Sequence, residues 1–148
     1  MDEAPTSALT DLLLRSDDPM WEKQEPWSRY AALCRQTPGD FPSYYLALLE
    51  EKGMARSEAI ANSGLEVHYA YQILSGVKKP RRDKLLCLCI GAGFSLLQTD
   101  RALERAEFSP LYPKRLRDAV IMLAVNRGCR TVWQVNELLA ERGEALLG

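Results

Sequence analysis

Five basic side chains gather in one short stretch of the chain, around a single acid, Asp83. They are Lys78, Lys79, Arg81, Arg82 and Lys84. Cations spaced this closely can bind the phosphates of a polyanion, because ammonium and guanidinium groups form charge-assisted hydrogen bonds with phosphate oxygens. The alternative is a solvated loop, in which Asp83 pairs with Arg82 or caps the helix that follows. The position of the loop, directly after an amphipathic helix, favours phosphate binding.

The segment before this loop, residues 66–75, predicts a helix with two different faces. Its inward residues are Ala70, Ile73 and Leu74, at the spacing of one apolar stripe. Its outward residues are Val67, His68, Tyr71 and Gln72. The only histidine of the chain therefore lies on the exposed face, without a Ser, Cys or carboxylate partner in a nucleophile pattern. We expect a surface contact there and not a catalytic base.

Other chemistry is weakly supported by the residue pattern. We find no phosphate-binding glycine loop, no paired carboxylates and no second Cys/His pair at zinc-ligand spacing. The four cysteines are Cys34, Cys87, Cys89 and Cys129, and they read as reduced thiols. The sequence therefore predicts a cytoplasmic protein that is not an enzyme and uses no catalytic residue, metal or cofactor.

Charge is distributed unevenly along the chain, although the formal net charge is only −1. Residues 1–40 contain eight acids and four bases, whereas residues 41–94 contain seven bases and five acids. A polyanion site must therefore be local and lie in the middle third. Trp21, Trp27 and Trp133 have no interleaved basic residues, which favours packing or dimer contacts over stacking on single-stranded nucleic acid.

Helix signals dominate, and the expected fold class is all-α. Pro42 suits the first turn of a helix, and Gly53, Gly64 and Gly76 mark three successive helix ends. The predicted helices are residues 43–53, 56–63 and 66–75, which together form the skeleton of a helix-turn-helix. We divide the chain into an acidic N-terminal helix and connector (1–40), a helix-turn-helix domain (41–107) and a C-terminal helical hairpin (108–148).

An internal repeat with a period of about 35 residues covers the second half of the chain. The segment "RDKLLCLCIGAGFSLLQTDRALERA", from Arg82, aligns with "RDAVIMLAVNRGCRTVWQVNELLAER", from Arg117, which has one extra residue in its turn. Each copy contains an Arg-Asp pair, an apolar helix, a glycine-containing turn, a Ser or Thr cap and an amphipathic helix. Two stacked helical hairpins or simple convergence of two antiparallel hairpins would explain the pattern.

A family resemblance rests on "LLEEKGMARSEAIANSGLEVHYAYQILSGVKKP", including the Gly64 to Gly76 spacing and Pro80 after the basic loop. This segment resembles the lambda-repressor-like (XRE) helix-turn-helix family of bacterial transcriptional regulators. "LYPKRLRDAVI" is similar to a hairpin found in a subset of these regulators. Together the resemblance covers residues 43–142, about two-thirds of the chain. It implies a lambda-repressor-like helix-turn-helix bundle with an added C-terminal helical hairpin and an N-terminal helical arm.

The resemblance also implies roles for single residues. The base-facing residues would be Val67, against a thymine methyl group, His68, Tyr71, which would reach sugar or phosphate, and Gln72, on an adenine edge. The phosphate contacts would be Arg56, Lys78, Lys79, Arg81 and Arg82. Glu66 would repel phosphate or accept a hydrogen bond from a cytosine amine. The chain departs from the family at Glu66, Val67 and His68, where Arg, Ser or Gln are frequent.

The function that follows is sequence-specific binding of double-stranded DNA by a transcriptional regulator, with repression as the expected mode. Such a monomer grips few phosphates, so we expect a homodimer held by the C-terminal hairpin or the Trp-containing arm. The alternative is a protein-interaction adaptor with weak or no DNA binding. The absence of Lys and Arg from residues 66–75 and the acidic residues 1–40, which could cover the basic loop, support that alternative.

Overall fold

The computed structural model describes residues 39–148, and within this range it contains seven helices and no strand. This confirms the all-α prediction for that part of the chain. The helix predicted near the N-terminus, Trp21, Trp27 and Cys34 lie outside the described residues. The helices are α3 (Phe41–Lys52), α4 (Arg56–Ser63), α5 (Val67–Leu74), α6 (Arg82–Gly91), α7 (Leu96–Arg105), α8 (Leu116–Asn126) and α9 (Val132–Glu141). None of these helices has the length and apolar character needed to cross a membrane.

Local signals determine where the first helices begin and end. The carboxylate of Asp40 accepts a hydrogen bond from the backbone N–H of Ser43 at 2.9 Å, and Pro42 occupies the first turn of α3. Gly53 and Gly64 follow α3 and α4 with φ values of 67° and 70°, in the left-handed region that favours glycine. The predicted ends of these two helices are therefore confirmed within a residue.

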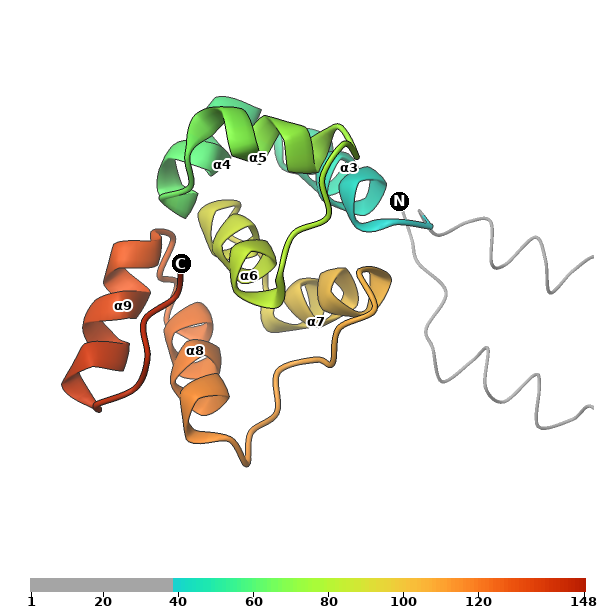
Figure 1. The fold of residues 1–148 in the computed structure, drawn as a ribbon. Coiled ribbons are helices and arrows are strands. Elements are labelled where there is room, and N and C mark those ends of the chain that lie inside the picture. The colour runs from blue at the N-terminus through green and yellow to red at the C-terminus, as the bar shows by residue number, and fades with distance from the viewer. Residues whose placement is uncertain (1–38) are drawn as a thin grey trace, which may run out of the picture. The chain divides into compact units, whose positions relative to one another are not determined.

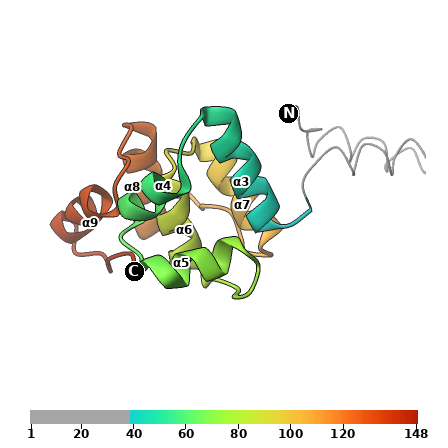
Figure 2. The same ribbon diagram turned by 90° about the horizontal axis from the view of Figure 1, so that it is seen from above.

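Helix α6 is the centre of the core. Every residue from Leu85 to Ile90 is at most 1% exposed, because helices pack around the whole circumference of α6. The Tyr45 hydroxyl donates to the Leu88 carbonyl at 2.8 Å, and α4 passes so close to Gly91 that a Cβ atom there would lie 2.8 Å from the Ser63 nitrogen. Figures 1 and 2 show α6 between α3–α5 and the α8–α9 hairpin.

The two copies of the sequence repeat have equivalent local contacts. Ser95 caps α7 in a reciprocal pair with Gln98, and the Gln134 side chain accepts from the Thr131 N–H at the start of α9. After each hairpin, a backbone N–H group of the following segment donates a hydrogen bond to a side chain on the second helix of that hairpin. Asp100 accepts from the Leu111 N–H at 2.9 Å. Asn136 accepts from the Leu147 N–H at 2.8 Å. The repeat in sequence is therefore also a repeat in structure.

The two Arg-Asp pairs of the repeat bind each other reciprocally. The Arg82 guanidinium donates to both carboxylate oxygens of Asp118 at 3.2 and 3.0 Å, and Arg117 donates to both oxygens of Asp83 at 3.0 and 2.8 Å. Asp83 thus pairs neither with Arg82 nor with its own helix start. An exchange of this kind is what an approximate two-fold relation between the hairpins α6–α7 and α8–α9 produces.

Each of these arginines also binds the chain that follows a hairpin. Arg82 donates to the carbonyls of Ser109 and Pro110, at 3.3 Å each, just after α7. Arg117 donates to the carbonyls of Ala145 and Leu146, at 2.8 and 2.9 Å, just after α9. The two arginines therefore join both hairpins and the segments that follow them, within the compact unit of residues 40–148.

Candidate nucleic-acid interface

Glu66 is the N-cap of α5. Its carboxylate accepts hydrogen bonds from the backbone N–H groups of Tyr69, at 2.7 Å, and His68, at 2.9 Å. These two bonds hold the pKa of Glu66 below its usual value. The carboxylate is thus occupied by the first turn of its own helix, where negative charge is favoured by the helix dipole. The expected contact of Glu66 with a cytosine amine would require breaking this cap.

The two faces of α5 are as predicted. Ala70 and Ile73 are fully buried and Leu74 is 3% exposed. On the other side Val67 is 57% exposed and Tyr71 39% exposed. His68 is also exposed and Gln72 is half-buried. The four residues predicted to face DNA bases therefore lie together on the accessible side of a helix whose opposite side is anchored in the core.

Arg56 joins this surface from the neighbouring helix. It is the first residue of α4, is exposed, and lines a shallow pocket together with three of the outward residues of α5, His68, Tyr71 and Gln72. Arg56 lies beside the exposed side of α5 although it begins α4, at the opposite end of that helix from the turn at Gly64. The structure thus brings together one predicted phosphate contact and three predicted base contacts.

The basic loop is folded back onto the end of α5. The Gln72 carbonyl accepts from the N–H groups of Val77 and Lys78 at 2.9 and 3.1 Å. The Lys78 ammonium lies 5.7 Å from the centre of the Tyr69 ring, within the range of a cation–π contact. The start of the loop is therefore held at a defined place beside α5.

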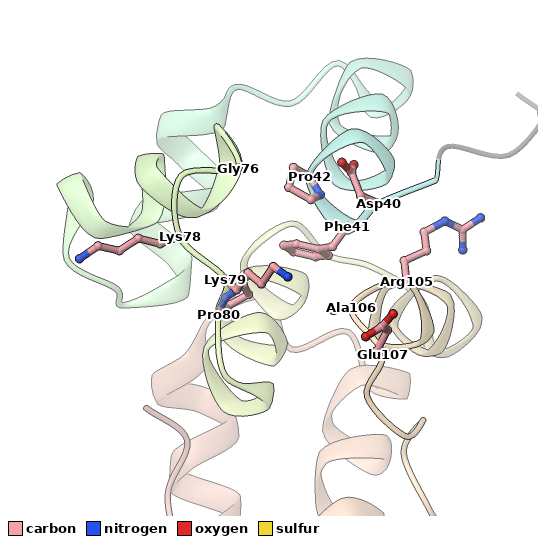
Figure 3. Close-up of a pocket in the computed structure, with 10 residues that line it drawn as sticks. All are labelled: Asp40, Phe41, Pro42, Gly76, Lys78, Lys79, Pro80, Arg105, Ala106 and Glu107. Carbon is pink, nitrogen blue, oxygen red and sulfur yellow. The ribbon is translucent and has the colours of Figure 1, made fainter.

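Lys78 and Lys79 point in different directions (Figure 3). Lys78 extends away from the pocket in this view, whereas Lys79 points into it. The pocket measures about 280 Å³ and is also lined by Phe41, Arg105 and Glu107. The two adjacent lysines therefore offer positive charge on two sides of the loop.

The remaining predicted phosphate contacts differ from each other. Arg81 is exposed and has no ion pair among residues 39–148. Arg82, its neighbour, directs its guanidinium to Asp118 and to two backbone carbonyls, and its side chain is only 20% exposed. Arg82 therefore has structural partners that a DNA phosphate would have to replace, whereas Arg81 does not.

Two features of this surface were missed by sequence reasoning. Tyr69 is half-buried, and the Lys78 ammonium lies over its ring. The Gln72 backbone organises the loop while the Gln72 side chain lines the α5 surface. Neither contact has a periodic signature, because both link a helix to an irregular segment. The Schellman-like turn at Gly76, with φ of 82°, was the only available hint.

No cluster of three or more His, Cys, Asp or Glu side chains within residues 39–148 could hold a metal ion. Burial raises the pKa of the Cys87 thiol to about 11 and raises the pKa of Cys89 as well. Both thiols are thus protonated at neutral pH and pack as small apolar groups.

Comparison with known proteins does not add to this picture: no family model, no curated protein and no solved structure matches the chain.

Proposed function

We propose that this protein binds double-stranded DNA sequence-specifically as a dimeric transcriptional regulator of the lambda-repressor-like (XRE) helix-turn-helix kind, with repression as its mode. The observation that carries the proposal is the α5 surface. It presents Val67, His68, Tyr71 and Gln72 outward, with Arg56 beside them and a basic loop held at the end of the helix. In this reading α3–α7 are the five helices of the domain, and α4 and α5 are its helix-turn-helix.

The dimensions and chemistry of α5 suit the major groove. An α-helix with its side chains is about 10–12 Å across, which fits a major groove about 12 Å wide. Val67 would contact a thymine methyl group and Gln72 would pair with an adenine edge. Arg56, Lys78, Lys79 and Arg81 would contact phosphates, which fix the register without reading sequence. We leave Arg82 out of this set because Asp118 holds its guanidinium.

A single copy with so few phosphate contacts would bind weakly. Roughly 3–4 contacts give a modest, salt-sensitive affinity. Two copies on a two-fold operator, with half-sites about 34 Å apart, would double the contacts and supply the specificity of two recognition helices. This is the reason for proposing a dimer as the DNA-binding form.

The second candidate function is a protein-interaction adaptor. The outward surface of α5 has no Lys or Arg and exposes Val67 and Tyr71, and Val77 in the next loop is 71% exposed. An apolar surface with an aromatic residue suits a protein partner as well as a base edge. What separates the two candidates is whether the basic loop contributes binding energy.

The test is selection from a pool of random DNA duplexes, sequenced after binding at two salt concentrations. We expect an enriched two-fold site whose affinity falls with salt. Gln72→Ala should relax the preference at one base pair in each half-site, by about 1–3 kcal/mol of discrimination. Lys79→Ala should lower the salt slope by about 1 per site without changing the sequence preference.

The control is Lys52→Ala, which removes an exposed lysine at the end of α3, outside the surface described above. It should change neither the slope nor the preference. A pool without enrichment, together with salt-independent retention, would contradict DNA binding and support the adaptor.

A further inference from the structure

A pocket of about 330 Å³ is formed by residues of α5, α6 and α9. Its walls are the turn before α5 and the start of that helix, the first two turns of α6 and of α9, and the segment that follows α9. The volume falls at the lower end of the range of small-molecule sites, about 300–1,000 Å³. None of the residues proposed to contact DNA lines this pocket. We call it the α5–α9 pocket.

Part of the lining of the α5–α9 pocket is apolar and buried. Cys87, Val132 and Leu147 line the pocket and are each at most 6% exposed. The Asn136 side chain holds Leu147 in place, because its oxygen accepts from the Leu147 N–H at 2.8 Å and its nitrogen donates to the Leu147 carbonyl at 3.2 Å. The pocket therefore offers a ligand an apolar wall that belongs to the core and has a defined position.

Two aromatic side chains from different helices also line the pocket. Trp133 is the second residue of α9 and is 57% exposed. Tyr69, on α5, is half-buried. Aromatic rings attract other flat rings by stacking or by edge-to-face contact, at centroid separations of about 4.5–7 Å. The lining of the pocket thus favours a ligand that contains an aromatic ring.

Lys84 is the only cation among the described residues that line the pocket. It is half-buried, and it forms no ion pair or hydrogen bond with another residue of 39–148. An ammonium group that has lost part of its water and has no counter-ion favours an anion, which can accept a charge-assisted hydrogen bond from it. The helical repeat does not require a lysine at this place, because the equivalent residue on α8 is Ala119. The pocket therefore has a position for one negative group of a ligand.

The acidic side chain on the lining, Glu66, is not the partner of Lys84. Its carboxylate accepts from the N–H groups of Tyr69 and His68 at 2.7 and 2.9 Å, and it forms no ion pair with Lys84. A second negative group on a ligand would be repelled by this carboxylate, since like charges disfavour each other at short range. The charges of the pocket therefore suit a ligand with a single carboxylate better than a dianion.

We propose that the α5–α9 pocket binds a small aromatic monocarboxylate. The carboxylate pairs with the Lys84 ammonium, and the ring packs against Trp133 and the apolar wall. This inference goes beyond the proposed function and does not depend on it, because no DNA contact takes part in the binding. Glu66 and Tyr69 belong to the start of α5, so the ligand touches the helix proposed to read DNA without touching its outward residues.

The decisive experiment is isothermal titration calorimetry of the full chain at pH 7 with two probes of the same shape. Indole-3-acetate carries one carboxylate, whereas indole-3-acetamide is neutral. The wild type should bind the acid at least about ten-fold more tightly than the amide, because only the acid forms a charge-assisted hydrogen bond with Lys84. Lys84→Met keeps an unbranched apolar side chain and removes the charge. It should reduce the affinity for the acid to that for the amide and leave the affinity for the amide unchanged.

Matched variants elsewhere in the chain serve as controls. Lys52→Met removes an exposed lysine outside the pocket and should change neither affinity. Trp133→Ala should weaken the binding of acid and amide alike, because the ring contact does not depend on charge. Leu97→Ala, at the equivalent place on α7, removes another exposed apolar side chain and should have no effect. Far-ultraviolet circular dichroism of each variant checks that the helices stay intact.

Four results would overturn the inference. These are a wild type that binds neither probe up to about 1 mM, equal affinity for acid and amide, a preference for the acid that persists in Lys84→Met, and binding that Trp133→Ala leaves unchanged. The titration contains no DNA, so its outcome is separate from that of the selection from random duplexes. Acid binding without an enriched DNA site would refute the proposed function alone, and an enriched site without acid binding would refute this inference alone.

Discussion

At the scale of single residues, the repeat places different side chains in equivalent surroundings. Glu107 follows α7 with φ of 63°, and the equivalent Gly143 follows α9 with φ of 69°. Asp100 on α7 and Asn136 on α9 each accept a hydrogen bond from a backbone N–H eleven residues later. In each case the residue in the α8–α9 hairpin suits its surroundings better than the equivalent residue in the α6–α7 hairpin. A prediction follows from each difference.

Glu107→Gly should stabilise the protein. A residue with a Cβ atom in the left-handed region carries a conformational cost of about 1–2 kcal/mol, part of which glycine loses again through its larger entropy when unfolded. We expect a net gain of about 0.5–1 kcal/mol in the free energy of unfolding, measured by urea denaturation. The control is Glu104→Gly, at an exposed position inside α7, which should cost about 1 kcal/mol. Equal losses in both variants would show that φ at Glu107 is not strained.

Asp100→Asn should remove a dependence of stability on pH. Burial raises the pKa of Asp100, so this carboxyl favours the folded state when it is protonated, and that contribution is lost as pH rises from about 4 through the folded pKa. Asparagine keeps the oxygen that accepts from Leu111, as Asn136 does for Leu147. Urea unfolding between about pH 4 and 7 should therefore show the variant gaining on the wild type as pH increases.

The variant Asp40→Asn serves as the comparison, because its stability relative to the wild type should change with pH in the opposite direction. The hydrogen bond from Ser43 lowers the pKa of Asp40, so its contribution is present above the unfolded pKa and is lost as pH falls through the folded pKa. That variant should lose most against the wild type at neutral pH. Identical pH trends in the two variants would contradict the assignment of both shifts.

At the scale of elements, the reciprocal Arg-Asp pairs hold α6 and α8 together at two levels of burial. The side chain of Asp118 is 4% exposed and that of Asp83 is 31% exposed. Asp118 also accepts from the Tyr112 N–H at 3.0 Å, so it ties the segment between the hairpins to the same point. The Arg82–Asp118 pair should therefore contribute more to the free energy of unfolding than the Arg117–Asp83 pair does.

Asp118→Asn should destabilise the protein by about 2–4 kcal/mol, because it leaves the Arg82 charge and part of its hydrogen bonding without a matching carboxylate in a mostly buried site. Asp83→Asn, the matched variant, should cost less than about 1 kcal/mol, since water screens a pair that is a quarter to a third exposed. Chemical denaturation of both proteins measures the difference. Equal costs would mean that burial does not set the strength of these pairs.

The helix boundaries also show where sequence reasoning succeeds. The ends of α3 and α4 follow from Gly53 and Gly64, and the outward and inward sides of α5 follow from its periodicity. Pro80 suits the first turn of a helix, but Arg81 is still extended and α6 begins at Arg82. The loop before α6 donates hydrogen bonds to the Gln72 carbonyl and must then reach the core, where α6 packs. No local sequence pattern predicts this constraint.

At the scale of the whole molecule, the α5 surface and the α8–α9 hairpin lie on different helices, with α6 between them (Figure 1). The two regions meet at one place, because Trp133 and Asn136 of α9 line a pocket together with Leu65, Glu66 and Tyr69. The four outward residues of α5 do not line this pocket. Substituting them should therefore leave the α8–α9 hairpin intact.

The sequence alone determined the helices, the buried side of α5 and the existence of a repeat, because capping, helix-ending glycines and apolar periodicity act over a few neighbouring residues. It placed Val67, His68, Tyr71 and Gln72 on one surface for the same reason. Only the tertiary structure decided which of two adjacent charged residues stays exposed and which forms an ion pair. Arg81 is left exposed while Arg82 binds Asp118, because an ion pair between residues 36 positions apart depends on how two helices pack and not on the residues beside it.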